Sequence, residues 1–95
     1  MDQILNNLGL CNKAHGLVTG NELVIEQLRK GKVYLIFLAS NAGLNTTKMV
    51  LDKAKYYNVP VNSNYSAEEL SKAIGKERRI VVGVTNKGFL KILMK

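Results

Sequence analysis

The polar pair Asn21 and Glu22 is the first feature of the chain with clear chemical possibilities. It follows Thr19 and Gly20, where a helix is predicted to begin. Thr19 and Glu22 have the spacing of a capping box, in which two side chains bond the free backbone N–H groups of a helix start. Such a box explains Glu22 but makes no use of Asn21. Alternatively, Asn21 and Glu22 present an amide and a carboxylate to the edge of a nucleic-acid base.

The apolar residues after this pair predict which side of the helix is buried. At about 100° per residue, the buried side comprises Leu23, Val24, Gln27 and Leu28. The neighbouring flank is predicted to face solvent near the amino end, and it comprises Asn21, Glu22, Ile25 and Arg29. We therefore expect an exposed surface there that combines an amide, a carboxylate and a cation.

Cations gather at two further places. Lys30 and Lys32 flank Gly31, where the helix is predicted to stop. A second group follows Gly75 and consists of Lys76, Glu77, Arg78 and Arg79. Three cations in four residues suit contacts with phosphates. A solvated charged turn is the alternative in both places.

Composition limits the class of protein and of partner. The 95 residues predict a single domain over 1–95, and 46% hydrophobic residues argue against disorder. Fourteen Lys and Arg against seven Asp and Glu give a charge of +7, which favours a polyanionic partner, most often nucleic acid, although it can also serve solubility. The single cysteine, Cys11, excludes an intrachain disulfide, and no apolar run is long enough for a membrane span. These features predict a cytoplasmic protein with no membrane partner.

The residue types give no sign of catalysis. His15 is the only histidine and has no cysteine or paired carboxylate in its motif, so we expect neither a metal nor a cofactor and no enzymatic activity. Gly31 and Lys32 lack the spacing of a phosphate-binding loop. Cys11 lies on an apolar helical stripe and is predicted to be a core residue. Tyr65 is predicted to lie in the core or at its rim, with stacking on a base as the alternative because it falls in a predicted loop.

Helical periodicity alternates with short apolar runs along the chain. Strands are predicted at 17–18, 33–39, 59–61 and 80–84, with Pro60 favouring an edge position for the third. Gly16 and Gly75 are placed to end two helices, and Ser66 with Glu69 forms a second capping box. The predicted fold is α/β, a three-layer α/β/α sandwich around a small mixed four-stranded sheet.

Three segments in this order resemble the kink-turn-binding ribosomal proteins, a superfamily with archaeal ribosomal and eukaryotic snoRNP and spliceosomal members. They are Gly20-Asn21-Glu22, then LRKGKVYLIFLASNAG at 28–43, then LSKAIG at 70–75. The likeness covers nearly the whole chain and is strongest to the small bacterial YlxQ-like members. It implies a monomeric, non-enzymatic protein that binds structured RNA and is associated with the ribosome.

The resemblance also implies roles for particular residues. The family's RNA is a kinked stem whose tandem sheared G·A pairs leave guanine edges open, so Asn21 and Glu22 are expected to read bases beside the Gly20 backbone. The loop at 75–79 is expected to contact the kink and its phosphates. The family carries a lysine where this chain has Ile25, and Arg29 is a candidate to replace that cation.

Two alternative functions remain open on the sequence. An exposed Ile25 favours a protein-interaction module that keeps the fold without kink-turn specificity. The high positive charge alone also allows RNA binding that is indifferent to sequence and shape.

Overall fold

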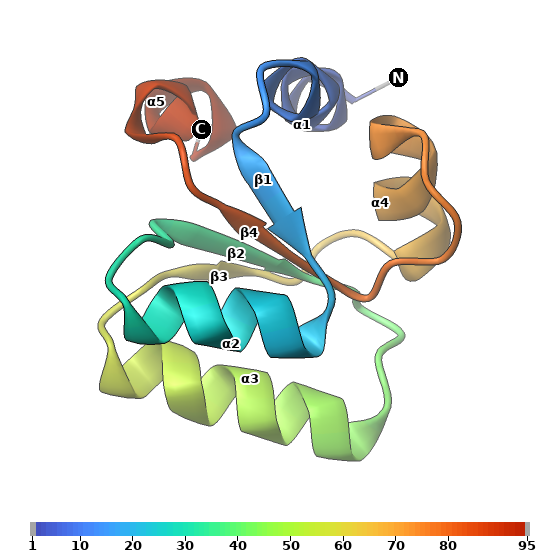
Figure 1. The fold of residues 1–95 in the computed structure, drawn as a ribbon. Coiled ribbons are helices and arrows are strands. Elements are labelled where there is room, and N and C mark those ends of the chain that lie inside the picture. Colours follow the sequence, from blue (N-terminus) through green and yellow to red (C-terminus); the bar gives the residue numbers. More distant parts are fainter. Residues whose placement is uncertain (1, 95) are drawn as a thin grey trace.

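A mixed four-stranded sheet forms the centre of the computed structural model, which describes residues 2–94 (Figure 1). The strands are β1 (Leu17–Thr19), β2 (Leu35–Leu38), β3 (Val61–Asn62) and β4 (Val81–Val84), in the spatial order β1-β4-β2-β3. β4 runs antiparallel to both β1 and β2, whereas β2 and β3 are parallel. The predicted mixed four-stranded sheet is therefore confirmed.

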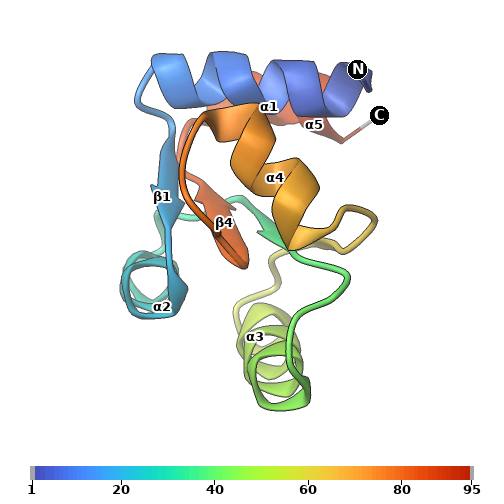
Figure 2. The same ribbon diagram turned by 90° about the vertical axis from the view of Figure 1, so that its right-hand side faces the viewer.

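Helices cover both faces of this sheet (Figures 1 and 2). α2 (Asn21–Arg29) and α3 (Leu44–Tyr56) lie on one face. On the other lie α1 (Gln3–Lys13), α4 (Ala67–Ile74) and α5 (Leu90–Leu93), the last preceded by a 3-10 turn, η1 (Lys87–Phe89). This arrangement is the predicted three-layer α/β/α sandwich.

Two hydrophobic clusters, one on each face, explain why β2 and β4 read as continuous apolar runs. Leu35 and Phe37 point into the cluster under α1, α4 and α5, while Ile36 and Leu38 point into the cluster under α2 and α3. Every residue of β2 and β4 is buried. A strand covered on both sides has no polar face, so its sequence does not alternate.

β2 and β4 are shorter than predicted, whereas β1 is one residue longer and β3 lies further along the chain. β2 spans four residues within the predicted 33–39, although Val33 and Ala39 are also buried. β3 begins one residue after Pro60 and lies at the sheet edge, where proline does not interrupt a ladder hydrogen bond.

Gly16 does not end α1 in the way predicted. The helix ends at Lys13, and His15 adopts the left-handed conformation with φ of 58°. Gly16 is needed for close packing instead, because a Cβ on it would lie 2.8 Å from both the Cys11 sulfur and the Asn86 Cβ. Cys11 is fully buried as predicted, and burial raises the pKa of its thiol to about 11.

α4 has both of its predicted ends. The Ser66 hydroxyl accepts from Glu69 N–H at 3.1 Å, and the Glu69 carboxylate accepts from Ser66 N–H at 3.0 Å. At the other end Gly75 is left-handed with φ of 66°. These two devices set where the loop at 75–79 leaves the helix.

Tyr65 is a core residue, as predicted, and the alternative that it stacks on a base is wrong. Its ring is only 9% exposed, and it packs against Phe37 with ring centroids 6.4 Å apart. Its hydroxyl donates to Asp2 Oδ1 at 2.9 Å. Burial, together with this hydrogen bond, raises the pKa of Tyr65 to about 12.

This raised pKa predicts how stability falls in alkali. An unfolded tyrosine loses its proton near pH 10 while the folded one keeps it, so the contribution of Tyr65 is complete below pH 10 and is lost as the pH rises towards 12. Between pH 10 and 12, we expect the free energy of unfolding, measured with denaturant, to fall less for Tyr65→Phe than for the parent protein. Tyr34→Phe serves as the control, and equal slopes for Tyr65→Phe and the parent would contradict the assignment.

Candidate functional site

The amino end of α2 is built on Gly20. Its N–H donates to the Val81 carbonyl at 3.0 Å, which ties the end of β1 to β4, and its own carbonyl accepts the first helical bond from Val24 N–H at 3.0 Å. The backbone N–H groups of residues 21–23 therefore have no partner within the helix. Gly20 makes this turn with φ of 93° and ψ of 148°, a conformation that favours glycine.

The predicted capping box at Thr19 and Glu22 is absent. Gly20, not Thr19, is the N-cap residue, and no side chain caps α2. Thr19 ends β1, so its hydroxyl faces the neighbouring loop and accepts from Arg79 Nε at 3.2 Å. Among the side-chain hydrogen bonds found within residues 2–94, none uses Asn21 or Glu22. The interpretation of Glu22 as a capping residue is thus wrong. Within residues 2–94, the side chains of Asn21 and Glu22 are not engaged in holding the start of α2.

α2 is rotated about its axis relative to the prediction. Ile25, predicted to be exposed, is only 8% exposed, whereas Leu23, predicted to be buried, is 43% exposed. The buried side is formed by Val24, Ile25 and Leu28, because α2 packs against α3 as well as the sheet. Ile25 belongs to that core and leaves only a small part of its surface exposed.

The predicted flank nevertheless forms one groove, of about 580 Å³. Its lining comprises Asn21, Glu22, Ile25, Glu26, Arg29 and, from α3, Met49. Met49 has the helical spacing of a core residue, but it is 37% exposed and forms the far wall of this groove. Ile25 gives the groove an apolar floor between polar walls.

The loop at 75–79 is held against the start of α2 by Arg79. Arg79 N–H donates to Ser71 Oγ at 2.6 Å, and its guanidinium donates to Thr19 and to the carbonyls of Glu77 and Arg78. The Arg79 side chain is half-buried, and most of its N–H donors bond other groups of the protein. Arg79 therefore orders the loop, while Lys76, Glu77 and Arg78 are exposed.

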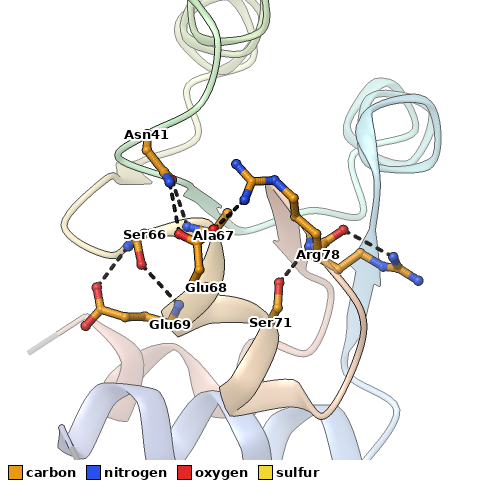
Figure 3. A network of polar contacts seen from close by, with 8 residues as sticks. Asn41, Ser66, Ala67, Glu68, Glu69, Ser71 and Arg78 are labelled. Atoms are coloured by element: carbon orange, nitrogen blue, oxygen red, sulfur yellow. Dashed lines mark hydrogen bonds and ion pairs between the residues drawn. The ribbon is translucent and has the colours of Figure 1, made fainter.

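A second polar network fixes the other side of the loop (Figure 3). Asn41 Nδ2 donates to Glu68 Oε1 at 3.0 Å, and Asn41 Oδ1 accepts from Ala67 N–H at 2.9 Å. Glu68 also pairs with Arg78 through Oε2 and Nη1. Hydrogen bonds from its own backbone N–H and from Asn41, with the charge of Arg78, hold the pKa of Glu68 below its usual value. Glu68 thus links the loop after β2 to the loop before β4.

A smaller pocket of about 300 Å³ joins the loop to α2. It is lined by Thr19, Gly20, Asn21, Arg78, Arg79, Ile80 and Val81. Asn21 borders this pocket as well as the larger groove, so it lies at the centre of the surface. The surface formed by the groove and the pocket therefore extends from Arg29 at one end to Arg78 at the other, with Asn21 between them.

Lys30 and Lys32 line neither the groove nor the smaller pocket. Lys30 pairs with Glu26 at 3.3 Å, and Lys32 follows Gly31 at the opposite end of α2 from Asn21. Within residues 2–94, no group of three His, Cys, Asp or Glu side chains is arranged to bind a metal ion. Likewise, none of the helices found there has both the length and the apolar character that a membrane span requires.

Sequence reasoning missed three contributors to this surface: Met49, Asn41 and Glu68. Met49 has helical spacing that fits the core, and Asn41 and Glu68 are 27 residues apart in separate elements. The one local signal was that Asn41 lies in the loop after a buried strand.

A family model matches residues 2–94, almost the whole chain, and it is the ribosomal protein L7Ae/L30e/S12e/Gadd45 family. The chain belongs to this family. The resemblance inferred from its segments at 20–22, 28–43 and 70–75 is therefore confirmed.

Two curated relatives carry the same printed name, RNA-binding protein YlxQ. The one from Bacillus subtilis (strain 168) is 45% identical over 86% of this chain and 82% of its own length. The one from Enterococcus faecium is 41% identical over 92% of this chain and 84% of its own length. These names agree with the prediction that the chain is not an enzyme.

Solved structures share the fold closely. A protein of unknown function from Bacillus halodurans has a TM-score of 0.95 and 39% identity, and the match covers 99% of this chain and 95% of that one. The Giardia lamblia 15.5 kD RNA-binding protein has a TM-score of 0.85 at 17% identity, covering 97% and 79%. At that identity the second likeness establishes the fold alone.

Proposed function

We propose that this protein binds structured RNA that contains a kink-turn, through the surface formed by the amino end of α2 and the loop at 75–79. The observation that carries the proposal is the pair Asn21 and Glu22. Both side chains line an open groove without serving as caps, and a basic loop lies beside them. The names of the YlxQ relatives support an RNA partner.

The chemistry of a kink-turn suits this pair. Sheared G·A pairs leave guanine edges open, and an Asn amide can bond their acceptors. A carboxylate accepts from the guanine N–H donors, which explains an acidic residue in a protein of charge +7. The free N–H groups of residues 21–23 add donors for a phosphate or a base acceptor at the same place.

The structure weakens the alternative that this surface binds a protein partner. That alternative depended on an exposed Ile25, and Ile25 is only 8% exposed. Its apolar atoms form the floor of the groove, where they can pack against a nucleotide. Burial also means that a lysine at position 25 has to extend its chain along the groove to keep its charge in water.

The test is a binding titration with two RNA stems. One contains a kink-turn, and in the other Watson–Crick pairs replace the tandem G·A pairs. We expect the first stem to bind more tightly by a factor that persists as salt is raised. Equal affinity for the two stems would mean that the protein binds RNA through charge alone and does not recognise the kink-turn. Failure to bind either stem would contradict the proposal of an RNA partner.

The loop at 75–79 gives a separate prediction about salt. Lys76 and Arg78 are exposed, so changing both to Gln is expected to weaken binding to every RNA and to reduce the slope of log K against log salt by about two or a little less. Arg79 is left intact because it orders the loop, and Arg78→Gln leaves an amide that can still donate to the exposed Glu68. The control is the double change Lys13→Gln and Lys91→Gln, which removes the same charge from α1 and α5. If both double variants give the same slope, the loop does not contact phosphates.

The proposal extends to the cellular setting. An RNA partner of this kind implies a cytoplasmic protein that acts as a monomer on ribosomal or other structured RNA. Sedimentation of the tagged protein with ribosomal subunits, before and after ribonuclease treatment, tests the association. Its absence from every ribosomal fraction would point to another structured RNA.

A further inference from the structure

The outer face of α3 carries a groove that the proposed kink-turn site does not use. The groove is about 530 Å³ in volume and is lined by Asn45, Lys48, Met49, Asp52, Lys53 and Tyr56. All six belong to one side of the helix, opposite to the buried Val50 and Ala54. The exposed leucines of α3, Leu44 and Leu51, are not part of this lining.

An aromatic ring lies at the far end of this groove. Tyr56 is 79% exposed, although an aromatic residue gains stability from burial. Its ring contacts Tyr57 edge to face, with centroids 4.9 Å apart and an interplanar angle of 81°. Tyr57 packs against the core cluster under α2 and α3, so it supports the Tyr56 ring from behind. The result is a supported aromatic ring that faces solvent.

The charge along α3 favours a polyanion. Lys48 and Lys53 line the groove and Lys55 follows on the exposed surface, against the single acidic residue Asp52. Three cations to one anion, together with an exposed tyrosine, form the usual combination for single-stranded nucleic acid, in which cations follow the backbone and an aromatic ring stacks on a base. An apolar protein partner would call for a row of aliphatic side chains in the groove, whereas Met49 is the one such side chain among its lining residues.

The groove on α3 is continuous with the proposed kink-turn site. Met49 lines both this groove and the one that contains Asn21 and Glu22. α2 and α3 lie side by side and start at the same end of the molecule (Figure 1). The lining residues Asn45 and Tyr56 are eleven positions apart, which spans roughly 16 Å along the helix axis.

We propose that the outer face of α3 binds a single-stranded segment that continues from the kink-turn stem, with one base stacked on Tyr56 and phosphates paired with Lys48 and Lys53. This inference rests on the proposed function and adds a second contact on the same RNA. It makes the protein a reader of a kink-turn together with its unpaired flank. Such an RNA is bound at two adjacent places, so its affinity exceeds that of the stem alone.

The experiment compares a kink-turn stem with the same stem carrying about six unpaired nucleotides at either its 5′ or its 3′ end. We expect the parent protein to bind one of the extended RNAs roughly tenfold more tightly than the stem. Tyr56→Ala is expected to abolish this gain and leave the affinity for the bare stem unchanged. Because Tyr56 is exposed, its removal should not disturb the fold, and an unfolding curve checks this.

Matched variants separate stacking from charge. Tyr56→Phe keeps the ring and should keep the gain, while Lys53→Gln should reduce both the gain and its salt dependence. Lys91→Gln removes the same charge from α5, on the other face of the sheet, and should leave the gain unchanged. A 4-thiouridine in the extension should cross-link to Tyr56 under ultraviolet light.

Two outcomes distinguish this inference from the proposed function. Tight binding of the stem with no gain from either extension overturns the α3 site, leaves kink-turn binding intact and makes a protein the remaining occupant for that face. Binding of the extended RNAs that depends on Tyr56 but not on the G·A pairs supports the α3 site and removes kink-turn recognition.

Discussion

Glu22→Gln and Asn21→Ala are expected to reduce the preference for an intact kink-turn over a stem with Watson–Crick pairs in place of its G·A pairs. Loss of one good base contact typically costs about 1–3 kcal/mol, or roughly five- to 150-fold in affinity. The change should fall on the intact stem, since the disrupted stem offers no matching edge. Neither side chain caps α2, so the free energy of unfolding should change little in both variants.

Glu22→Gln tests the chemistry most directly because it preserves shape. The carboxylate offers two acceptor oxygens, whereas the amide offers one acceptor and adds a donor that repels a guanine N–H. Glu26→Gln is the matched control, as it removes the same charge from the next turn of the same groove. Both variants make the protein more positive, so a purely electrostatic effect would strengthen RNA binding in each. If Glu22 reads a base, Glu22→Gln weakens binding to the intact kink-turn while Glu26→Gln strengthens it.

Thr19→Ala separates this role from the structure of the site. Thr19 accepts from Arg79 Nε at 3.2 Å, so its loss should loosen the loop at 75–79 and weaken binding to both stems alike. Titration of each variant with both stems, beside its unfolding curve, provides the measurement. An unchanged preference in Asn21→Ala and Glu22→Gln would mean that the kink-turn is not read by this pair.

Most of the fold could be predicted because local and tertiary preferences agree. The buried strands β2 and β4 are apolar throughout, and α4 carries its own start and stop signals in Ser66 and Gly75. α2 was the exception, since its rotation depends on α3. Packing against a second helix buries Ile25 and releases Leu23, and no periodicity within a nine-residue helix reveals that neighbour.

The site divides along the same line. Asn21 and Glu22 are adjacent in the chain, so their shared location was visible in the sequence. The Asn41, Glu68 and Arg78 network joins three segments that only the sheet order brings together (Figure 3). Arg79 was predicted to bind phosphate on charge alone, but its contacts with Thr19 and Ser71 depend on where β1 ends. The positive charge of the loop could be predicted from its residues. That Arg79 orders the loop while Arg78 is exposed could not.

Gly20→Ala is expected to cause the largest loss of stability at this surface. With φ of 93° and ψ of 148°, Gly20 lies close to a backbone region that is essentially restricted to glycine, and a side chain there costs of order 1–3 kcal/mol. A Cβ on Gly20 would meet nothing within 4 Å, so the cost comes from backbone conformation and not from a clash. For a domain of this size, each 1 kcal/mol lowers Tm by about 4–8 °C.

Gly43→Ala supplies the control, because Gly43 is also the glycine N-cap of a helix, α3, and also has open space around it. Its φ of −62° and ψ of 157° are ordinary for any residue. Both changes share the weaker capping of alanine and the lower entropy of the unfolded chain. The difference in unfolding free energy between the two variants therefore isolates the strain at Gly20. That strain can relax only by moving the Gly20 N–H away from Val81 or by turning the start of α2, and either shift displaces Asn21 and Glu22. We accordingly expect Gly20→Ala, measured well below its Tm, to lose kink-turn affinity as well, while Gly43→Ala keeps it. Equal stability losses in the two variants would show that the conformation of Gly20 is not what holds the site in place.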